Sequence, residues 1–253
     1  MVHALDPVDE FLIDNQLVEG LIASGDIAVL YGAPKTGKSF LAVDLAVALS
    51  NGDGWFDRAV SPAKVLYWAG EDFSGLIARR TACARHKGGC GVFSIDNDPL
   101  SLAPSQATDT VDALATILRY ELAPSRLEDP NDYVSLPPVL IIDTWAMLTA
   151  SMDENSGKDM SAAMAALREL QARVSNLTII IIHHAGKDGS RGMRGHSSLL
   201  GAVDVAIEVD RSSKGLGGGT VRSARRNPTG ATGQFRLKPV SLPAGALSVA
   251  GTQ

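Results

Sequence analysis

The most constraining feature of this sequence is a glycine-rich segment, GAPKTGKS, at residues 32–39. It matches the phosphate-binding pattern G-x-x-x-x-G-K-[ST], which functions between a strand and a helix. An apolar run at residues 27–31 precedes it and predicts the strand. Leucines at four-residue spacing in residues 40–49 follow it and predict the helix. The segment therefore predicts an α/β fold built around a phosphate-binding loop.

The residue types of this loop predict how it holds a nucleotide. Gly32 and Gly37 permit backbone angles that turn successive N–H groups toward phosphate oxygens. Lys38 is expected to neutralise the β and γ phosphates, and the Ser39 hydroxyl is expected to bind Mg²⁺. The expected cofactors are therefore ATP and Mg²⁺. The predicted nucleotide-binding residues are Gly32, Ala33, Pro34, Lys35, Thr36, Gly37, Lys38, Ser39 and Phe40.

Apolar runs alternate with helical patterns through most of the chain, which is typical of βα units and a mostly parallel sheet. Further strands are predicted at residues 65–69, 139–142 and 178–182, and helices at residues 74–87, 108–122 and 160–174. Beyond residue 202 antiparallel hairpins are expected, with strands at residues 203–209, 220–224 and 234–237 and a mobile glycine-rich tip at residues 215–219. The expected organisation is a lead-in arm at residues 1–25, one ATPase domain at residues 26–240 and a tail at residues 241–253.

The bulk properties of the chain are those of a cytoplasmic α/β protein. Its 253 residues suffice for one large domain with a sizeable core. It has two cysteines and no basic and apolar leader, so secretion is not indicated. No apolar stretch approaches the roughly 20 residues that span a bilayer. Zinc is not expected, because Cys83, His86 and Cys90 lack an evident fourth ligand.

The charge is distributed unevenly along the chain. The net charge of −5 argues mildly against a nucleic-acid partner, because affinity for phosphates comes mainly from lysine and arginine. Residues 185–240, however, contain ten basic residues and four acidic ones. This basic segment is compatible with nucleic-acid binding, and scattered arginines on a solvated face are the alternative interpretation.

Two carboxylates directly follow predicted strands. Asp143 ends the apolar run VLII at the sheet edge where ligands bind, and it is the expected second Mg²⁺ residue, with Thr144 supporting it. Glu71 comes just after the preceding strand and is the candidate that orients the attacking water, because no glutamate follows Asp143. Capping of the next helix is an alternative role for Glu71, and Asp72 or Ser74 fits that role equally well.

Together these motifs resemble the RecA/DnaB superfamily, and most closely the RepA-type plasmid and phage helicases that consist of a single RecA-like core. The resemblance implies a RecA-like P-loop NTPase fold, with a mostly parallel sheet flanked by helices and C-terminal antiparallel hairpins. In the segment AGED, Glu71 matches the catalytic base of the family. In IIIIHHAGK, His184 matches the sensor of the γ phosphate. Lys38 completes the catalytic groups within the subunit.

Two arginines match residues that reach a neighbouring subunit's nucleotide in this family. Arg194 lies in RGMRGHSS and matches the finger of the RepA-type pattern. Arg226 lies in RRNPTG and matches the hairpin arginine of DnaB-type helicases. The lysine of that hairpin pattern falls on Ala224, and Arg225 or Arg222 is the candidate replacement. Both Arg194 and Arg226 therefore stay candidates for the finger.

An arginine supplied by a neighbour implies a homo-oligomer, either a ring of six subunits or a filament. Loops at residues 150–159 and 186–196 would then face a central channel. In the second loop, Lys187, Arg191 and Arg194 are the expected contacts to the backbone of single-stranded DNA. The first loop is acidic, so a solvent-exposed loop is an equal alternative there.

The function expected from this resemblance is an ATP-driven motor on single-stranded DNA, namely a replicative helicase of plasmid or phage type. The main alternative is a RecA-like or KaiC-like oligomeric ATPase that acts in recombination, loading or regulation without unwinding. A small-molecule kinase is a third interpretation, for which the sequence shows no arginine-rich lid.

Overall fold

The structure is a computed structural model, and it describes residues 15–87, 93–121, 136–184, 196–211, 216–225, 229–237 and 240–242. The strands are β1 (Gln16–Val18), β2 (Ile22–Ala23), β3 (Ile27–Gly32), β4 (Lys64–Ala69), β5 (Ser94–Asp96), β6 (Pro138–Asp143), β7 (Thr178–His184), β8 (Val205–Arg211), β9 (Leu216–Ala224) and β10 (Thr232–Arg236). The helices are α2 (Lys38–Asn51), α3 (Phe73–Lys87), α4 (Ala107–Glu121), α5 (Trp145–Leu148), α6 (Gly157–Arg173) and α7 (His196–Ala202).

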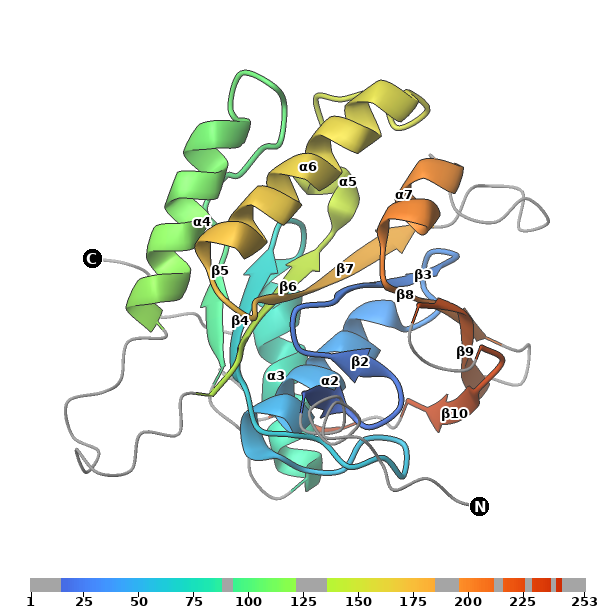
Figure 1. The fold of residues 1–253 in the computed structure, drawn as a ribbon. Coiled ribbons are helices and arrows are strands. Elements are labelled where there is room, and N and C mark those ends of the chain that lie inside the picture. The colour runs from blue at the N-terminus through green and yellow to red at the C-terminus, as the bar shows by residue number, and fades with distance from the viewer. Residues whose placement is uncertain are drawn as a thin grey trace, which may run out of the picture.

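Eight of these strands form one sheet in the order β10-β9-β8-β3-β7-β6-β4-β5 (Figure 1). The pairs from β8 to β5 are parallel, whereas β9 and β10 pair antiparallel at one edge. The expected fold class, a mostly parallel RecA-like sheet with C-terminal hairpins, is confirmed. β7 lies between β3 and β6, so the strand that leads into the P-loop does not pair with the strand that ends in Asp143.

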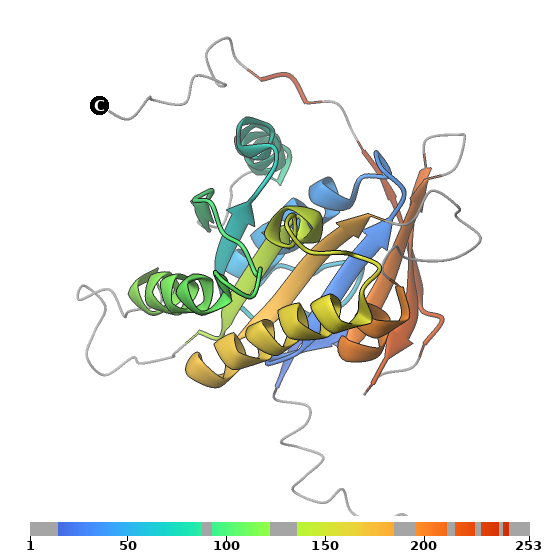
Figure 2. The same ribbon diagram turned by 90° about the horizontal axis from the view of Figure 1, so that it is seen from above.

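Helices cover both faces of the sheet (Figure 2). The alternation of side chains along β3 explains this layering, because successive residues point to opposite faces. Ala28 and Leu30 pack in the cluster that includes α2, whereas Ile27, Val29 and Tyr31 pack in the cluster that includes α4 and α6. The central strands are therefore buried on both faces, as their almost purely aliphatic sequences require. No helix of the described part is long and apolar enough to cross a membrane.

The glycine-rich segment was predicted as a mobile tip, but its glycines at residues 217–219 lie inside β9. A Cβ on Gly217 would lie 2.3 Å from the Phe235 ring, and a Cβ on Gly218 would lie 2.6 Å from Asp210. The glycines therefore allow large neighbouring side chains to lie against β9, which is a packing role that periodicity does not reveal. The short strands β1, β2 and β5 were also missed, and Leu17 and Val18 of β1 are buried in the core.

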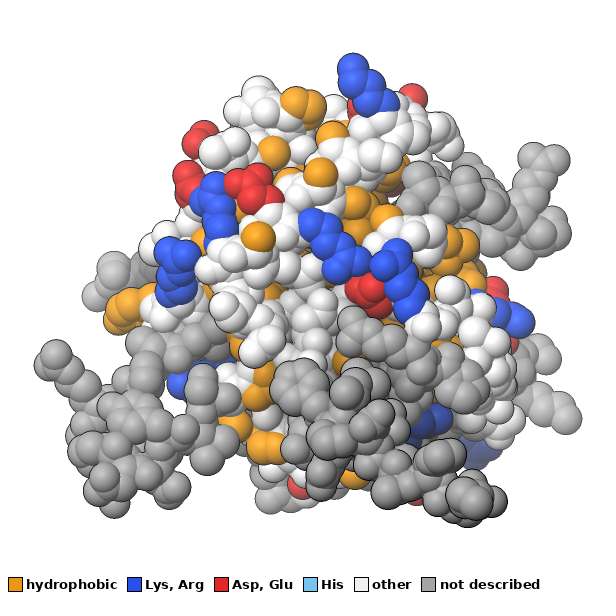
Figure 3. All heavy atoms as spheres, in the orientation of Figure 1, with side chains coloured by type: hydrophobic (Ala, Val, Ile, Leu, Met, Phe, Trp, Pro, Cys, Tyr) orange, Lys and Arg blue, Asp and Glu red, His pale blue; other side chains and the backbone are white. Residues whose placement is uncertain are grey.

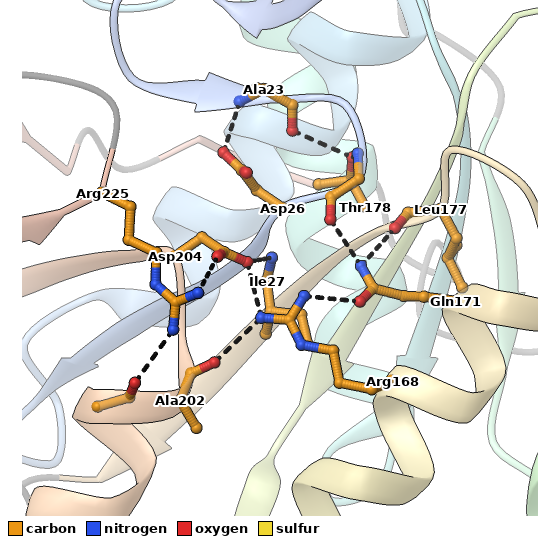
Figure 4. A network of polar contacts seen from close by, with 12 residues as sticks. Ala23, Asp26, Ile27, Arg168, Gln171, Leu177, Thr178, Ala202, Asp204 and Arg225 are labelled. Carbon is orange, nitrogen blue, oxygen red and sulfur yellow. Dashed lines mark hydrogen bonds and ion pairs between the residues drawn. The ribbon is translucent and has the colours of Figure 1, made fainter.

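Asp204 holds together the sheet edge opposite the P-loop (Figure 4). Its side chain is nearly buried, and Oδ2 accepts a 2.8 Å hydrogen bond from the backbone N–H of Ile27 at the start of β3. Arg168 of α6 pairs with Oδ2 at 3.0 Å, and Arg225 pairs with Oδ1 at 3.3 Å. One carboxylate therefore ties α6 and the end of β9 to the first residue of β3.

We expect Asp204→Ala to lower the free energy of unfolding by about 2 kcal/mol, because a buried N–H group and two arginines lose their acceptor. The matched control is Asp112→Ala, which removes the exposed partner of Arg173 and should cost about 0.5 kcal/mol or less. Urea unfolding followed by circular dichroism measures both. Equal losses in the two variants would contradict a special role for Asp204.

Candidate active site

The P-loop joins β3 to α2 at the carboxyl edge of the parallel strands, where ligands bind in α/β sheets. Gly37 has a φ of 105°, in the region that favours glycine. A Cβ on Gly32 would lie 2.0 Å from the carbonyl oxygen of Val209 in β8, so a larger residue does not fit there. Within the described residues, no side chain caps the start of α2. The first N–H groups of this helix are therefore left for an anion.

Lys38 is folded back onto the loop. Its Nζ donates to the carbonyl oxygens of Gly32 at 3.0 Å and Ala33 at 2.8 Å, and the residue is 4% exposed. Burial lowers the pKa of Lys38 to about 8, against the opposing effect of the negative charges of Asp143 and Glu71. The cation is therefore held at the phosphate site by neutral carbonyls, which a phosphate group can replace as the better acceptor.

Asp143, at the end of β6, lies against α2. Its Oδ2 accepts a 2.7 Å hydrogen bond from the Tyr67 hydroxyl, and its carboxylate also bonds the Ser39 side chain. Burial raises the pKa of Asp143, and the hydrogen bonds from Tyr67 and Ser39 oppose that shift. The structure thus brings together the two residues predicted for Mg²⁺. A hydroxyl and a carboxylate are oxygen donors that suit this ion, so the residues present fit it.

Glu71 lies beside the same strand end. The Thr144 hydroxyl donates to Glu71 Oε1 at 2.7 Å, and the backbone N–H of Gly70 donates to the carbonyl oxygen of Asp143 at 2.7 Å. Thr144 was expected to support Asp143, but its hydroxyl binds Glu71 instead. The charge of Glu71 acts on the pKa values of both Lys38 and Asp143, so Lys38, Ser39, Asp143 and Glu71 form one cluster.

The alternative role for Glu71, the capping of α3, is filled by Asp72. Asp72 Oδ1 accepts from the backbone N–H of Gly75 at 2.9 Å, and Oδ2 pairs with Arg79 at 2.7 Å. Because α3 begins at Phe73, Asp72 is in the position from which a carboxylate caps the helix. Glu71, one residue earlier, points its carboxylate toward Thr144.

The histidine pair lies between the P-loop strand and the Asp143 strand. In the register of β3 with β7, His184 is opposite Gly32 and His183 is opposite Tyr31. His183 is 2% exposed, whereas His184 is half-buried. His184 therefore lies next to the first residue of the P-loop, as the sensor assignment requires. Within the described part of the chain, no group of three potential metal ligands occurs.

Several predicted residues lie outside the described residues: Lys187, Arg191, Arg194 and Arg226. Cys90 does so too. These assignments stay predictions. Of the predicted channel loop at residues 150–159, the last three residues form the first turn of α6, which Ser156 caps by accepting from the Asp159 N–H at 3.2 Å.

The two arginines considered as replacements for the missing lysine lie at different ends of β9. Arg222 bonds Glu208, which is opposite Tyr31 and so lies near the P-loop. Arg225 pairs with Asp204 at the other edge of the sheet. About 17 Å of β8 separates Asp204 from the residue beside Gly32, at the usual rise of a strand. Arg225 is therefore directed away from the P-loop of its own subunit.

A cavity that the sequence did not reveal opens beside the P-loop. It encloses about 310 Å³ between α2, α3 and the end of β10. Phe40 is 45% exposed at its rim, and the Arg79 guanidinium lies 5.2 Å from the Phe40 ring centre. Phe235 and Leu237 approach Gly37 from the other side. No local signal predicts this, because Phe235 is nearly 200 residues from the P-loop in sequence.

The lowered pKa of Lys38 predicts a pH dependence of nucleotide binding. Phosphate oxygens favour the protonated lysine, so affinity should be constant below about pH 7 and fall by up to about tenfold per pH unit above pH 8. ATP binding at pH 8.5 should then take up a proton. Calorimetry in two buffers of different ionisation enthalpy measures this uptake. Lys38→Met should abolish it, and uptake that persists in that variant would exclude Lys38 as its source.

Comparison with known proteins gives a family and a fold. Residues 10–190 match the family AAA_25, which is described as an AAA domain. Among solved structures, the chain is similar to the ATPase domain of a DnaB-like helicase, with a TM-score of 0.58 at 14% identity over 90% of this chain and 92% of that chain. No curated protein matches. Because the family match covers more than half of the chain, this protein belongs to the AAA_25 family, within the RecA/DnaB-type superfamily of P-loop ATPases.

Proposed function

We propose that this protein is an ATP-driven motor on single-stranded DNA, and specifically a ring-forming replicative helicase of plasmid or phage type. The observation that carries the proposal is the hydrogen-bonded cluster of Ser39, Asp143, Thr144 and Glu71 around Lys38. Such a cluster holds phosphate, a metal and a water-orienting carboxylate at one sheet edge, which is what hydrolysis of a nucleoside triphosphate needs.

In the proposed reaction, the P-loop N–H groups bind the β phosphate, and Lys38 exchanges the Gly32 and Ala33 carbonyls for phosphate oxygens. Ser39 and Asp143 hold Mg²⁺, which neutralises charge on the β and γ phosphates. Glu71 orients the attacking water. His184 contacts the γ phosphate and so distinguishes ATP from ADP. The base of the nucleotide would lie in the cavity beside Phe40.

The proposed assembly is a hexameric ring in which a neighbour supplies Arg226 or Arg194. Support comes from Arg225, because a side chain held at the edge opposite its own P-loop is suited to act between subunits. The same reasoning favours the hairpin arginine, Arg226, over a residue of the channel loop.

DNA contact is proposed through Lys187, Arg191 and Arg194. The face that carries α4, α6 and α7 offers less, since its lysines and arginines are interspersed with acidic side chains (Figure 3). Arg168 and Arg173, both on α6, are each paired with carboxylates. Paired arginines release few counterions on binding DNA, so this face is a poor phosphate-binding surface.

Glu71→Gln should keep ATP binding and lower the hydrolysis rate by about 100-fold or more, because the amide does not act as a base. The matched control is Asp72→Asn, one residue away, where asparagine still caps α3 and hydrolysis should be retained. Steady-state ATPase rates and binding of a fluorescent ATP analogue measure both effects. Full turnover in Glu71→Gln would remove Glu71 from the catalytic role.

ATPase activity should rise with single-stranded DNA, and the stimulation should fade between low and high salt, because phosphate contacts release counterions. Mass photometry of the same sample should show a six-subunit species. A DNA-independent rate together with no strand separation would contradict the motor. In that case an open filament would favour the RecA-like or KaiC-like alternative.

A further inference from the structure

Tyr67 lies at the centre of the sheet, in contact with the predicted metal carboxylate. It is fully buried in β4, and its hydroxyl donates to Asp143 Oδ2 at 2.7 Å. In the parallel register of β4 with β6, Tyr67 is opposite Ile141 and Ala69 is opposite Asp143. Tyr67 and Asp143 are thus diagonal neighbours on the α2 face of the sheet, at a separation that a long aromatic side chain spans.

The hydroxyl is held in place by packing. Tyr67 belongs to the core cluster that includes α2, and its ring lies 6.0 Å from the Phe93 ring at an angle of 33°. A tyrosine has few rotatable bonds, and in a packed core these take one setting. The position of the hydroxyl is therefore fixed by the sheet and not by the solvent or a ligand.

Asp143, in contrast, has a terminal torsion that is broad unless something restrains it. The Tyr67 hydroxyl occupies Oδ2, and Ser39 contacts the same carboxylate from the start of α2. The plane of the carboxylate is thereby set relative to the Ser39 hydroxyl. Hydrogen bonds of this kind to metal ligands typically account for about 10-fold to 100-fold in metal affinity or activity.

We propose that Tyr67 is a positioning residue for the metal ion: its hydroxyl orients Asp143 so that the carboxylate and Ser39 present their oxygens together. The inference rests on the proposed ATPase function and adds a residue to its site. Tyr67 itself touches neither nucleotide nor metal. Its effect is on metal affinity, and nucleotide binding without metal does not depend on it.

The test is Tyr67→Phe, which removes the hydroxyl and keeps the ring beside Phe93. Mn²⁺ binding to the protein with ADP, followed by electron paramagnetic resonance, should weaken about tenfold. ADP binding in EDTA should be unchanged. The matched control is Tyr31→Phe, which removes a buried tyrosine hydroxyl in β3 and should leave Mn²⁺ affinity unchanged. Thermal unfolding should show that Tyr67→Phe keeps its fold.

A double-mutant cycle separates positioning from packing. In an Asp143→Asn background, Tyr67→Phe should cause no further loss of Mn²⁺ affinity, because the hydroxyl acts through the carboxylate. Wild-type Mn²⁺ affinity in Tyr67→Phe, or equal losses with and without Asp143, would overturn the inference and leave the proposed ATPase intact. Absence of metal-dependent nucleotide binding in the wild type would overturn both.

Discussion

Asp143 is the residue through which the parts of the candidate site are fixed relative to one another. Its carboxylate contacts Tyr67 from β4 and Ser39 from α2, and its backbone carbonyl accepts from Gly70, the residue before Glu71. A buried carboxylate is costly unless it is well hydrogen-bonded, so this residue requires its partners to stay in place. The requirement links the P-loop helix, the β6 end and the β4 end into one unit.

The insertion of β7 between β3 and β6 sets the spacing of this unit. Strands lie about 4.8 Å apart, so the P-loop strand and the Asp143 strand are separated by roughly 10 Å. The start of α2 bridges that gap with Ser39, and β7 fills it with His184. Glu71 follows β4, one strand further on. The arrangement leaves room for a phosphate chain over β7, with phosphate-binding groups on one side and carboxylates on the other.

The sequence predicted the parallel core well, because the aliphatic strands 139–142 and 178–182 are buried on both faces and the P-loop pattern fixes a strand, a loop and a helix. It predicted which carboxylates converge, because parallel strands end at one edge. It did not predict the Tyr67 contact or the partner of Thr144, since both depend on β4 pairing with β6, which one sequence does not encode. Strands of two or three residues are too short for periodicity to reveal.

The antiparallel hairpin supplies what a parallel sheet lacks. Parallel strands present all their carboxyl ends at one edge, so residues at the opposite edge need a strand that runs back. β9 does this: it starts near the P-loop and ends where Arg225 meets Asp204. β10 then returns and brings Phe235 against Gly37. One hairpin thus contacts both edges of the sheet, and Asp204 also binds the first residue of β3, which leads into the P-loop. The two edges are therefore connected through packed and hydrogen-bonded backbone, and the hairpin cannot shift along β8 without disturbing the P-loop.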